Sequence, residues 1–560
     1  MATVLELTDA LYAEDGDAKT LPARVTARLE KNGCKAADLP LLTQRAYAAG
    51  RAPPGALVRY VGMVQDMGNP EFYAPAVDVD GSSVCVAFRD ELPSGADPSN
   101  ARLADRKPFF CIAPPGTTRW AAGPTTEMLP PPPATSAAKR PREEDAAPPS
   151  KQACGGNAFA YASNDAARAV QAPDGVLVRI YGTEEGGPRL NELIGIVGIV
   201  GGGLATTGLG MAEADDDAFD QQRLEDEAAW DPPLSKVARL HALSWRRLDP
   251  SHPVLPGALD GATAENVRIA LLERLALALG GDAIAAEYAL CALLAAVDKR
   301  KDGRAVGALS LGLLCADAGA VALVARNLER VYGEVLPRVC AAKTSTASAP
   351  LRSPGSERLA MSSLQLCDGS ALITVVDGTA PASPAAAAAT GALKQLYGSS
   401  KQIPFNFGFT QVQVPSDVVS IRIGIEDGGI ECDVDLPLEL NHQAPLPDLS
   451  ESTLGILRQY VAAARRVVVD IDEEGASGLE DQFVAARATG RLPLRDAEDR
   501  LHQWVALAKL KARSLGSATL APPHWNDAFD LEEERSKRLK ERARAARAMA
   551  PPPPRSVQRL

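Results

Sequence analysis

The sequence predicts a multidomain protein of the α+β or α/β class, with a small β-rich domain, a disordered linker, an α/β core and a helical C-terminus. At about 150 residues per domain, the 560 residues predict three or four domains. The hydrophobic fraction of 46% and the charged fraction of 23% are typical of globular chains. Strand-like alternation and helical periodicity also occupy separate stretches of the chain.

Residues 1–52 carry short helical patterns of apolar residues, and residues 53–120 change to strand-like patterns. Strands are expected at 57–64 and 109–112, with a hairpin around Asp80-Gly81, because that dipeptide suits a tight turn. Several short strands with turn signals predict a small OB-like barrel.

Residues 121–173 are dominated by Pro, Ala, Ser and charged residues. Such a composition cannot bury enough apolar surface to offset its chain entropy, so we predict a disordered linker. A second segment, residues 213–231, holds nine carboxylates against a single arginine and is expected to be a solvated acidic loop.

The α/β core is expected to span residues 174–450, followed by a helical region at 451–560. Residues 234–300 have a strong helical pattern, interrupted where Gly280 and Gly281 precede Asp282, an expected helix N-cap. A strand is predicted to end at Asp377, and a loose loop is predicted at 380–390. Alternating apolar residues then predict an antiparallel meander with strands at 405–409, 421–425 and 430–434.

The formal net charge is 59 − 71 = −12, and only 5% of the residues are aromatic. Both values argue against a protein that coats single-stranded nucleic acid. Nine cysteines lie singly, and the five histidines show no metal-ligand spacing, so reduced thiols and no metal site are expected. Residues 305–325 are poor in charge, but their Ala and Gly content predicts a buried strand–helix pair rather than a membrane span. We expect a soluble intracellular protein with no membrane partner.

Several motifs, in order along the chain, resemble the mini-chromosome maintenance (MCM) complex-binding protein family. The most specific is the run Val64-Gln65-Asp66-Met67 followed by Pro70-Glu71-Phe72-Tyr73. Further matches are the Phe110-Cys111 segment with Trp120, the run Leu279–Tyr288, and Asp499–His502 with Trp525. Together they cover nearly the whole chain.

The resemblance implies a nuclear accessory factor of DNA replication that binds subunits of the MCM helicase and acts in its assembly and unloading. It also implies roles in the cell cycle, in cell division and in sister-chromatid cohesion. No enzymatic activity, cofactor or small-molecule substrate is implied, and any association with chromatin is expected to be indirect.

Because the helicase subunits are AAA+ ATPases, a nucleotide site is one possibility. A phosphate loop needs Gly-x-x-x-x-Gly-Lys-Ser/Thr, and the chain has no match. Leu209 replaces the lysine after Gly203–Gly208, and Glu287 lies where a hydroxyl residue belongs after Asp282. Asp377 ends a strand that resembles a Walker B strand, but Gly378 follows it. We interpret this pattern as a degenerate AAA+-like core; an ordinary helix hairpin and strand remain the alternative.

Two basic clusters are candidate recognition segments. Lys139, Arg140 and Arg142 lie in the linker and are typical of a nuclear localisation signal, although a chance basic patch is the alternative. Residues 535–547 hold seven basic residues, which we interpret as a solvated helix face rather than as a nucleic-acid or acidic-partner contact.

The candidate partner-binding residues are Asp66, Glu71, Phe72 and Tyr73, expected on a loop just past a strand end. Tyr73 is the preferred anchor because its hydroxyl tolerates a wet edge, whereas Phe72 is equally compatible with a core position. Two other functions stay open from the sequence: an active ATPase, and a direct DNA-binding module built on residues 53–120.

Overall fold

The protein is described from a computed structural model of the chain. The residues that it describes are 3–43, 46–47, 50–90, 92–97, 101–121, 175–182, 187–189, 192–202, 237–248, 261–345, 351–352, 359–360, 364, 367–377, 384–406, 411–441, 445–471, 478, 480–481, 483–485, 488 and 497–549.

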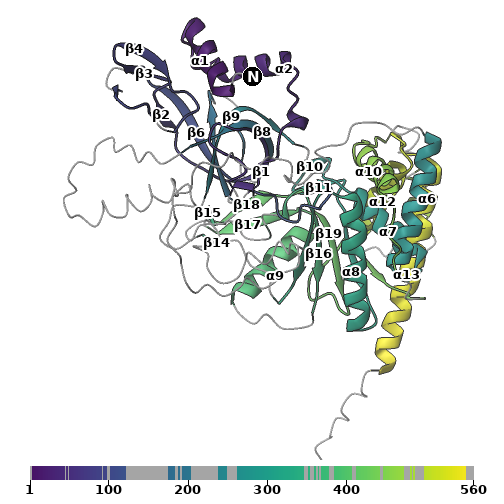
Figure 1. The fold of residues 1–560 in the computed structure, drawn as a ribbon. Coiled ribbons are helices and arrows are strands. Elements are labelled where there is room, and N and C mark those ends of the chain that lie inside the picture. Colours follow the sequence, from purple (N-terminus) through teal and green to yellow (C-terminus); the bar gives the residue numbers. More distant parts are fainter. Residues whose placement is uncertain are drawn as a thin grey trace, which may run out of the picture. The chain divides into compact units, whose positions relative to one another are not determined.

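The chain forms two compact units (Figure 1). Unit 1 comprises residues 1–250 with 351–361, and unit 2 comprises residues 251–350 with 362–560. The mixed α/β content agrees with the expected multidomain fold class.

Five strands of unit 1 close into a barrel. They are β1 (Leu57–Met67), β6 (Ala104–Ile112), β7 (Gly175–Tyr181), β8 (Leu193–Val200) and β9 (Ala238–Arg247). β1 pairs with both β6 and β8, β6 pairs with β7, and β9 pairs with β7 and β8. Only the β7–β9 pair is parallel among these. Closure removes the exposed edges that an open five-stranded sheet would have.

Alternate residues of these strands face the barrel interior, as the period of two in a strand requires. Val58, Val64, Phe109, Val178 and Leu240 are among the residues of this inner core. The opposite face of the sheet forms a second core beneath two N-terminal helices, α1 (Val4–Asp15) and α2 (Leu21–Lys31). The N-terminal helical segment therefore belongs to the barrel unit.

A small three-stranded sheet accompanies the barrel, made of β3 (Ala76–Val79), β4 (Ser82–Cys85) and β5 (Ala96–Asp97). Asp80 and Gly81 join β3 to β4 with φ of 53° and 79°. Two consecutive positive φ angles are the signature of a tight hairpin turn, so the hairpin predicted at this dipeptide is confirmed.

Unit 2 is built on a five-stranded parallel sheet with the order β13-β16-β19-β12-β20. The strands are β12 (Ser310–Leu314), β13 (Val339–Lys343), β16 (Ala371–Val375), β19 (Val419–Gly424) and β20 (Val434–Pro437). All of their pairings are parallel. β12 and α8 (Ala318–Val335) are the buried strand–helix pair expected within residues 305–325.

Helices cover this sheet and share one large core with it. They are α6 (Gly261–Ala278), α7 (Ala283–Leu294), α8, α10 (Glu451–Arg465), α12 (Ala497–Ser514) and α13 (Pro522–Met549). Gly280 and Gly281 have φ of 69° and 88° between α6 and α7, and the Asp282 side chain accepts a hydrogen bond from the Ala285 amide. The predicted helix end and N-cap are thus confirmed.

The remaining elements are two helices, a short edge strand and three two-stranded pairs. They are the helix η1 (Ala36–Asp38), α9 (Pro384–Tyr397), the edge strand β2 (Glu71–Tyr73), and the pairs β10 (Lys299–Lys301) with β11 (Arg304–Val306), β14 (Leu351–Arg352) with β15 (Leu359–Ala360), and β17 (Gln402–Asn406) with β18 (Gln411–Pro415).

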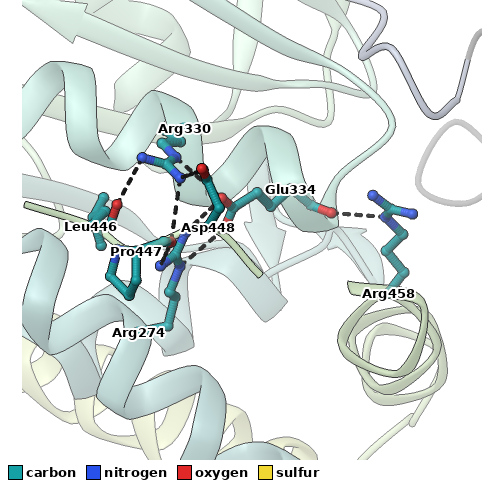
Figure 2. Close-up of polar contacts among 7 residues, drawn as sticks. All are labelled: Arg274, Arg330, Glu334, Leu446, Pro447, Asp448 and Arg458. Carbon is teal, nitrogen blue, oxygen red and sulfur yellow. Dashed lines mark hydrogen bonds and ion pairs between the residues drawn. The ribbon is translucent and has the colours of Figure 1, made fainter. Parts of the chain in front are cut away.

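Glu334 on α8 joins three helices and a loop (Figure 2). Its carboxylate accepts hydrogen bonds from both Arg274 on α6, at 2.6 and 3.1 Å, and Arg330, at 3.3 Å. Its backbone carbonyl accepts one from Arg458 on α10, at 2.8 Å. Arg330 also pairs with Asp448 at 2.6 Å. The two-pronged Arg274 contact is the strongest geometry here, and it explains how a buried guanidinium is compensated.

The domain boundaries differ from those expected. β7 and β8, expected in the core at 174–450, pair with β6 and β1 of the barrel, so the boundary between the units lies near residue 250 rather than 174. The described helices of the C-terminal part, α10, α12 and α13, share the core of the parallel sheet rather than forming a separate region. Both differences arise because strand and helix faces are buried by partners distant in sequence.

Three local predictions are also corrected. Within 234–300, residues 238–247 form strand β9 rather than helix, and within 380–390 helix α9 begins at Pro384. The prediction of an antiparallel meander is wrong, because β12 lies between β19 and β20 in the sheet and all three strands are parallel. Strands buried on both faces are rich in apolar residues and are easily mistaken for half-buried alternating strands.

In the part of the chain that the structure describes, no single helix has the length and apolar character needed to cross a membrane. The segments Ala264–Ala278 and Ala283–Leu294 meet that test only as a pair, and they are bent by 116° relative to each other.

Candidate functional site

The four candidate partner-binding residues lie on strands, not on a loop. Asp66 is the penultimate residue of β1, and Glu71, Phe72 and Tyr73 form β2, which pairs with β6. Residues 68–70 alone separate the two strands. The loop expected from Gly68 and Pro70 is therefore a short connection at the edge of the barrel sheet.

Of the two aromatic residues, Phe72 rather than the preferred Tyr73 is the exposed one. Phe72 is 75% exposed. The ring of Tyr73 instead packs edge-on against Tyr181, with 5.1 Å between ring centroids, and the Arg106 guanidinium lies 5.3 Å from the Tyr73 centroid. Burial raises the pKa of Tyr73. Tyr73 is thus partly buried and packs against the core, whereas Phe72 is exposed.

Glu71 belongs to a chain of ion pairs on the outer face of β6 and β7. Its carboxylate lies 2.9 Å from Arg106 on β6 and 3.2 Å from Arg179 on β7. Arg179 also pairs with Asp90, whose side chain is only 3% exposed. The two arginines are therefore neutralised by carboxylates from the segment that connects β1 to β6.

Asp90 also contacts a buried histidine of β9. The distance from His241 Nε2 to Asp90 Oδ1 is 3.3 Å, and His241 Nδ1 lies 2.5 Å from the Tyr181 hydroxyl. A tyrosine hydroxyl that donates to Nδ1 would leave the Nε2 proton directed at Asp90. Asp90, His241 and Tyr181 thus form a continuous buried polar chain.

Burial and pairing act in opposite directions on these groups. Burial alone would raise the pKa of Asp90, but the hydrogen bond from His241 and the nearby positive charges lower that pKa to about 2. Burial lowers the pKa of His241, so its imidazole is neutral near pH 7. Burial raises the pKa of Tyr181 to about 12. The cluster therefore holds Asp90 charged and leaves His241 and Tyr181 neutral.

The segment that supplies these groups covers the outer face of β6 and β7. The ring of Phe88 packs against Tyr181 with 4.9 Å between centroids, next to the Asp90 ion pair. Val86, Ala87 and Phe88 are buried as well. We call residues 71–90 the closing segment, because they bury Tyr181 and Arg179 beneath the chain's own residues.

A second candidate site in unit 2 is the carboxyl end of its parallel strands, because open α/β sheets bind their ligands there. β12 ends at Leu314 and α8 begins at Ala318, so three residues form the connection. The Asp317 carboxylate there accepts a hydrogen bond from the Ala320 amide at 2.9 Å. A carboxylate thus occupies the helix N-terminus that a phosphate would need.

Sequence reasoning did not single out this junction. The glycine-rich run 203–208 lies outside the described residues, and the Gly280–Tyr288 run joins two helices rather than a strand and a helix. The sequence does contain a signal for this junction, because residues 305–325 predict a buried strand–helix pair. Asp317 lies between the strand and the helix in the structure.

The three Walker-like residues all have structural partners. Asp282 is 2% exposed and accepts hydrogen bonds from Arg538, at 2.6 Å, and from the Glu439 amide, at 3.1 Å. Asp377 accepts hydrogen bonds from the hydroxyls of Thr344, at 3.1 Å, and Ser345. The structure therefore gives Asp282 and Asp377 local partners within unit 2.

Glu287 lies within α7 rather than at a phosphate loop. Both of its carboxylate oxygens lie 2.9 Å from Arg268, and one of them lies 2.9 Å from Lys511. The side chain therefore links three helices, α6, α7 and α12.

The basic run 535–547 is only partly a solvated face. Arg535 pairs with Glu532 at 2.6 Å, and Arg538 pairs with Asp282. Arg542 donates to the carbonyl oxygens of Cys315, at 3.3 Å, and of Ile425. Arg535 and Arg538 also donate to the carbonyl oxygens of Asp435 and Pro437 on β20, at 3.4 and 3.3 Å. α13 therefore contacts β20 and the carboxyl ends of β12 and β19, while Arg544 and Arg547 remain exposed.

Three sequence predictions fall outside the residues that the structure describes: the linker from residue 122 onward, the basic cluster Lys139, Arg140 and Arg142 within it, and the acidic segment 213–231. Within the described residues, no group of three or more His, Cys, Asp or Glu side chains is placed to hold a metal ion.

Comparison with known proteins identifies relatives along most of the chain. The model of a family described as "Mini-chromosome maintenance replisome factor" matches residues 27–173 and 170–539. A mini-chromosome maintenance complex-binding protein of Arabidopsis thaliana is 27% identical over 530 residues, covering 87% of this chain and 88% of the relative. The protein of that name from Salmo salar is 25% identical over 571 residues, covering 87% and 89%. The one from Homo sapiens is 25% identical over 350 residues, covering 57% and 53%.

The Asp90 cluster predicts a specific pH dependence of stability. The pKa of Asp90 is about 2 in the folded protein, below its ordinary value of 3.8, so its contribution is complete above pH 4 and is lost as the pH falls towards 2. A pKa shift of this size corresponds to a contribution of about 2 kcal/mol to the free energy of unfolding. In Asp90→Asn, the free energy of unfolding should fall at pH 7, because Arg179 loses its buried partner, by about 3 kcal/mol.

Urea unfolding followed between pH 7 and pH 2 measures this difference. The difference in free energy of unfolding between the wild type and Asp90→Asn should become smaller below pH 4. The exposed Asp105 on β6 is the control, and Asp105→Asn should have the same free energy of unfolding as the wild type at every pH. A difference that stays constant down to pH 2 would show that the Asp90 charge contributes nothing to folding.

Proposed function

The chain belongs to the mini-chromosome maintenance replisome factor family, and from this premise we propose that it is a non-enzymatic accessory protein that binds subunits of the MCM replicative helicase. The observation that carries the proposal is the extent of the match, which runs through both units. Two relatives whose alignments cover 87% of this chain are named for binding the MCM complex.

Unit 2 supports a role without ATP hydrolysis. We propose that its parallel sheet is a degenerate AAA+-like core. A phosphate loop has six residues, Gly-x-x-x-x-Gly, before its lysine, and the three-residue connection from β12 to α8 leaves no room for them. The Asp317 carboxylate at the start of α8 would also repel a phosphate. The active-ATPase alternative therefore has the weaker support.

Unit 1 supports a protein partner rather than nucleic acid. We propose that the barrel is OB-like, with β6 and β7 as its second and third strands, the face on which OB folds bind oligonucleotides. In this chain the closing segment covers that face. Arg106 and Arg179 already pair with Glu71 and Asp90, so they are not free to bind phosphates. This weakens the DNA-binding alternative.

The cellular role that we propose follows the family. The protein acts in the nucleus during DNA replication, in the assembly and unloading of the helicase, with a further role in sister-chromatid cohesion. Its association with chromatin is indirect, through the helicase. Asp66, Glu71, Phe72 and Tyr73 stay the proposed partner region, with Phe72 as the contact and Glu71 and Tyr73 as supports.

The first test is direct binding. Purified full-length protein, mixed with purified MCM subunits of the same organism, should coelute with at least one of them in size-exclusion chromatography. An unrelated hexameric AAA+ ATPase serves as the control and should elute alone. Coelution with neither protein, or with both equally, would contradict the proposed function.

The second test concerns nucleotide. A site occupied at 100 times its Kd would stabilise the protein by about 2.7 kcal/mol. Because Asp317 fills the helix terminus, Mg-ATP should leave the melting temperature unchanged, and Asp377→Ala should respond as the wild type does. An ATP-dependent rise in melting temperature that Asp377→Ala abolishes would support the ATPase alternative instead.

The third test concerns localisation. Changing Lys139, Arg140 and Arg142 together to alanine should move a fluorescent fusion from the nucleus to the cytoplasm, because short basic clusters of this kind act as import signals. The melting temperature of the purified variant should match the wild type. Nuclear retention of the variant would place the signal elsewhere in the chain.

A further inference from the structure

β2 is the last strand in the order β1-β8-β9-β7-β6-β2, and among the described residues it pairs only with β6. One long side of Glu71–Tyr73 thus presents backbone amide and carbonyl groups without a neighbouring strand. Proteins usually protect such edges, because they readily pair with another chain. The side chain at the centre of this edge, Phe72, is 75% exposed.

A second exposed apolar residue lies close to Phe72 along the partner strand. Phe72 lies opposite Asp105 on β6, and Leu103, which directly precedes β6, is 61% exposed. Long and aromatic side chains can reach beyond the residue directly opposite them in a strand pair. We call these two exposed residues, Phe72 and Leu103, the apolar strip.

The edge is held rigidly from the opposite face. Glu71 is fixed by Arg106 and Arg179, and the Tyr73 ring packs on Tyr181. Because β2 alternates, the residues on either side of Phe72 point into the closed face while Phe72 points away from it. A partner therefore meets a preorganised strand and incurs little ordering cost.

We propose that an extended segment of an MCM subunit adds to this edge as a further strand, with an apolar side chain packed between Phe72 and Leu103. The proposal rests on the proposed function and names the surface and the mode of binding. Main-chain hydrogen bonds to β2 supply affinity, and the apolar strip supplies selectivity for the side chain that faces it.

The charges around the edge favour a peptide over a nucleic acid. Asp105 lies opposite Phe72, and Asp66 lies at the end of β1, while the Glu71 carboxylate is already paired with Arg106 and Arg179. A phosphate backbone at this edge would meet the Asp105 carboxylate, whereas a peptide strand brings uncharged amide groups. Lys107 is the nearest basic residue on the Phe72 face of β6, and its ammonium group lies over the Phe109 ring at 5.6 Å.

Phe72→Thr tests the apolar anchor, because threonine keeps the strand propensity and removes the aromatic ring. Affinity for the MCM subunit that the wild type binds, measured by biolayer interferometry with that purified subunit, should fall at least about tenfold. Leu103→Thr should also weaken binding. Val468→Thr, which changes a 62% exposed valine of unit 2, is the matched control and should bind as the wild type does. All three variants should have the melting temperature of the wild type.

Amide hydrogen exchange in the complex tests the strand addition itself. Exchange within residues 71–73 should slow when the MCM subunit is bound. Wild-type affinity in Phe72→Thr, or unchanged exchange at 71–73, would overturn the inference and leave the proposed function standing. Absence of binding by the wild type would overturn both.

Discussion

The buried carboxylate of Asp90 is the constraint on which unit 1 depends. It pairs with Arg179 on β7 and lies 3.3 Å from His241 on β9, so one residue of the closing segment is tied to two strands of the barrel. A Cβ at Gly201 would lie 2.2 Å from an Asp90 oxygen, so this position just after β8 requires glycine. Once Asp90 is fixed, Phe88 covers Tyr181 and the outer face of the barrel is closed.

Closing that face has a consequence for recognition. The closing segment, which buries Arg179, begins with β2, and Phe72 of β2 is exposed. The arginine and tyrosine side chains on the outer face of β6 and β7 are therefore covered, while β2 pairs only with β6 among the described residues. Unit 2 shows a comparable use of its own charged groups: Asp317 occupies the start of α8, and Arg542 binds carbonyl oxygens at the carboxyl ends of the parallel strands. In both units, charged side chains of the chain itself occupy these places.

Local patterns were sufficient for features set by neighbouring residues. The Asp80-Gly81 turn and the Asp282 cap depend on backbone angles and one side-chain bond within a few residues, and both were predicted. Features set by distant pairing were not. β9 joins the barrel only through β7 and β8, and β12 separates β19 from β20 although it lies about a hundred residues earlier in the chain. The exposure of Phe72 rather than Tyr73 depends on the register of β2 against β6, which a three-residue strand cannot reveal in its sequence.

The central proposal is that the barrel is an OB-like protein-docking module in which the chain itself covers the face that binds oligonucleotides in OB folds. Fluorescence anisotropy with a labelled oligothymidylate, at protein concentrations that saturate binding to an MCM subunit, tests it most directly. The account predicts no change in anisotropy and no competition by unlabelled oligothymidylate for the MCM subunit. Oligonucleotide binding in the same concentration range, with displacement of the subunit, would contradict it.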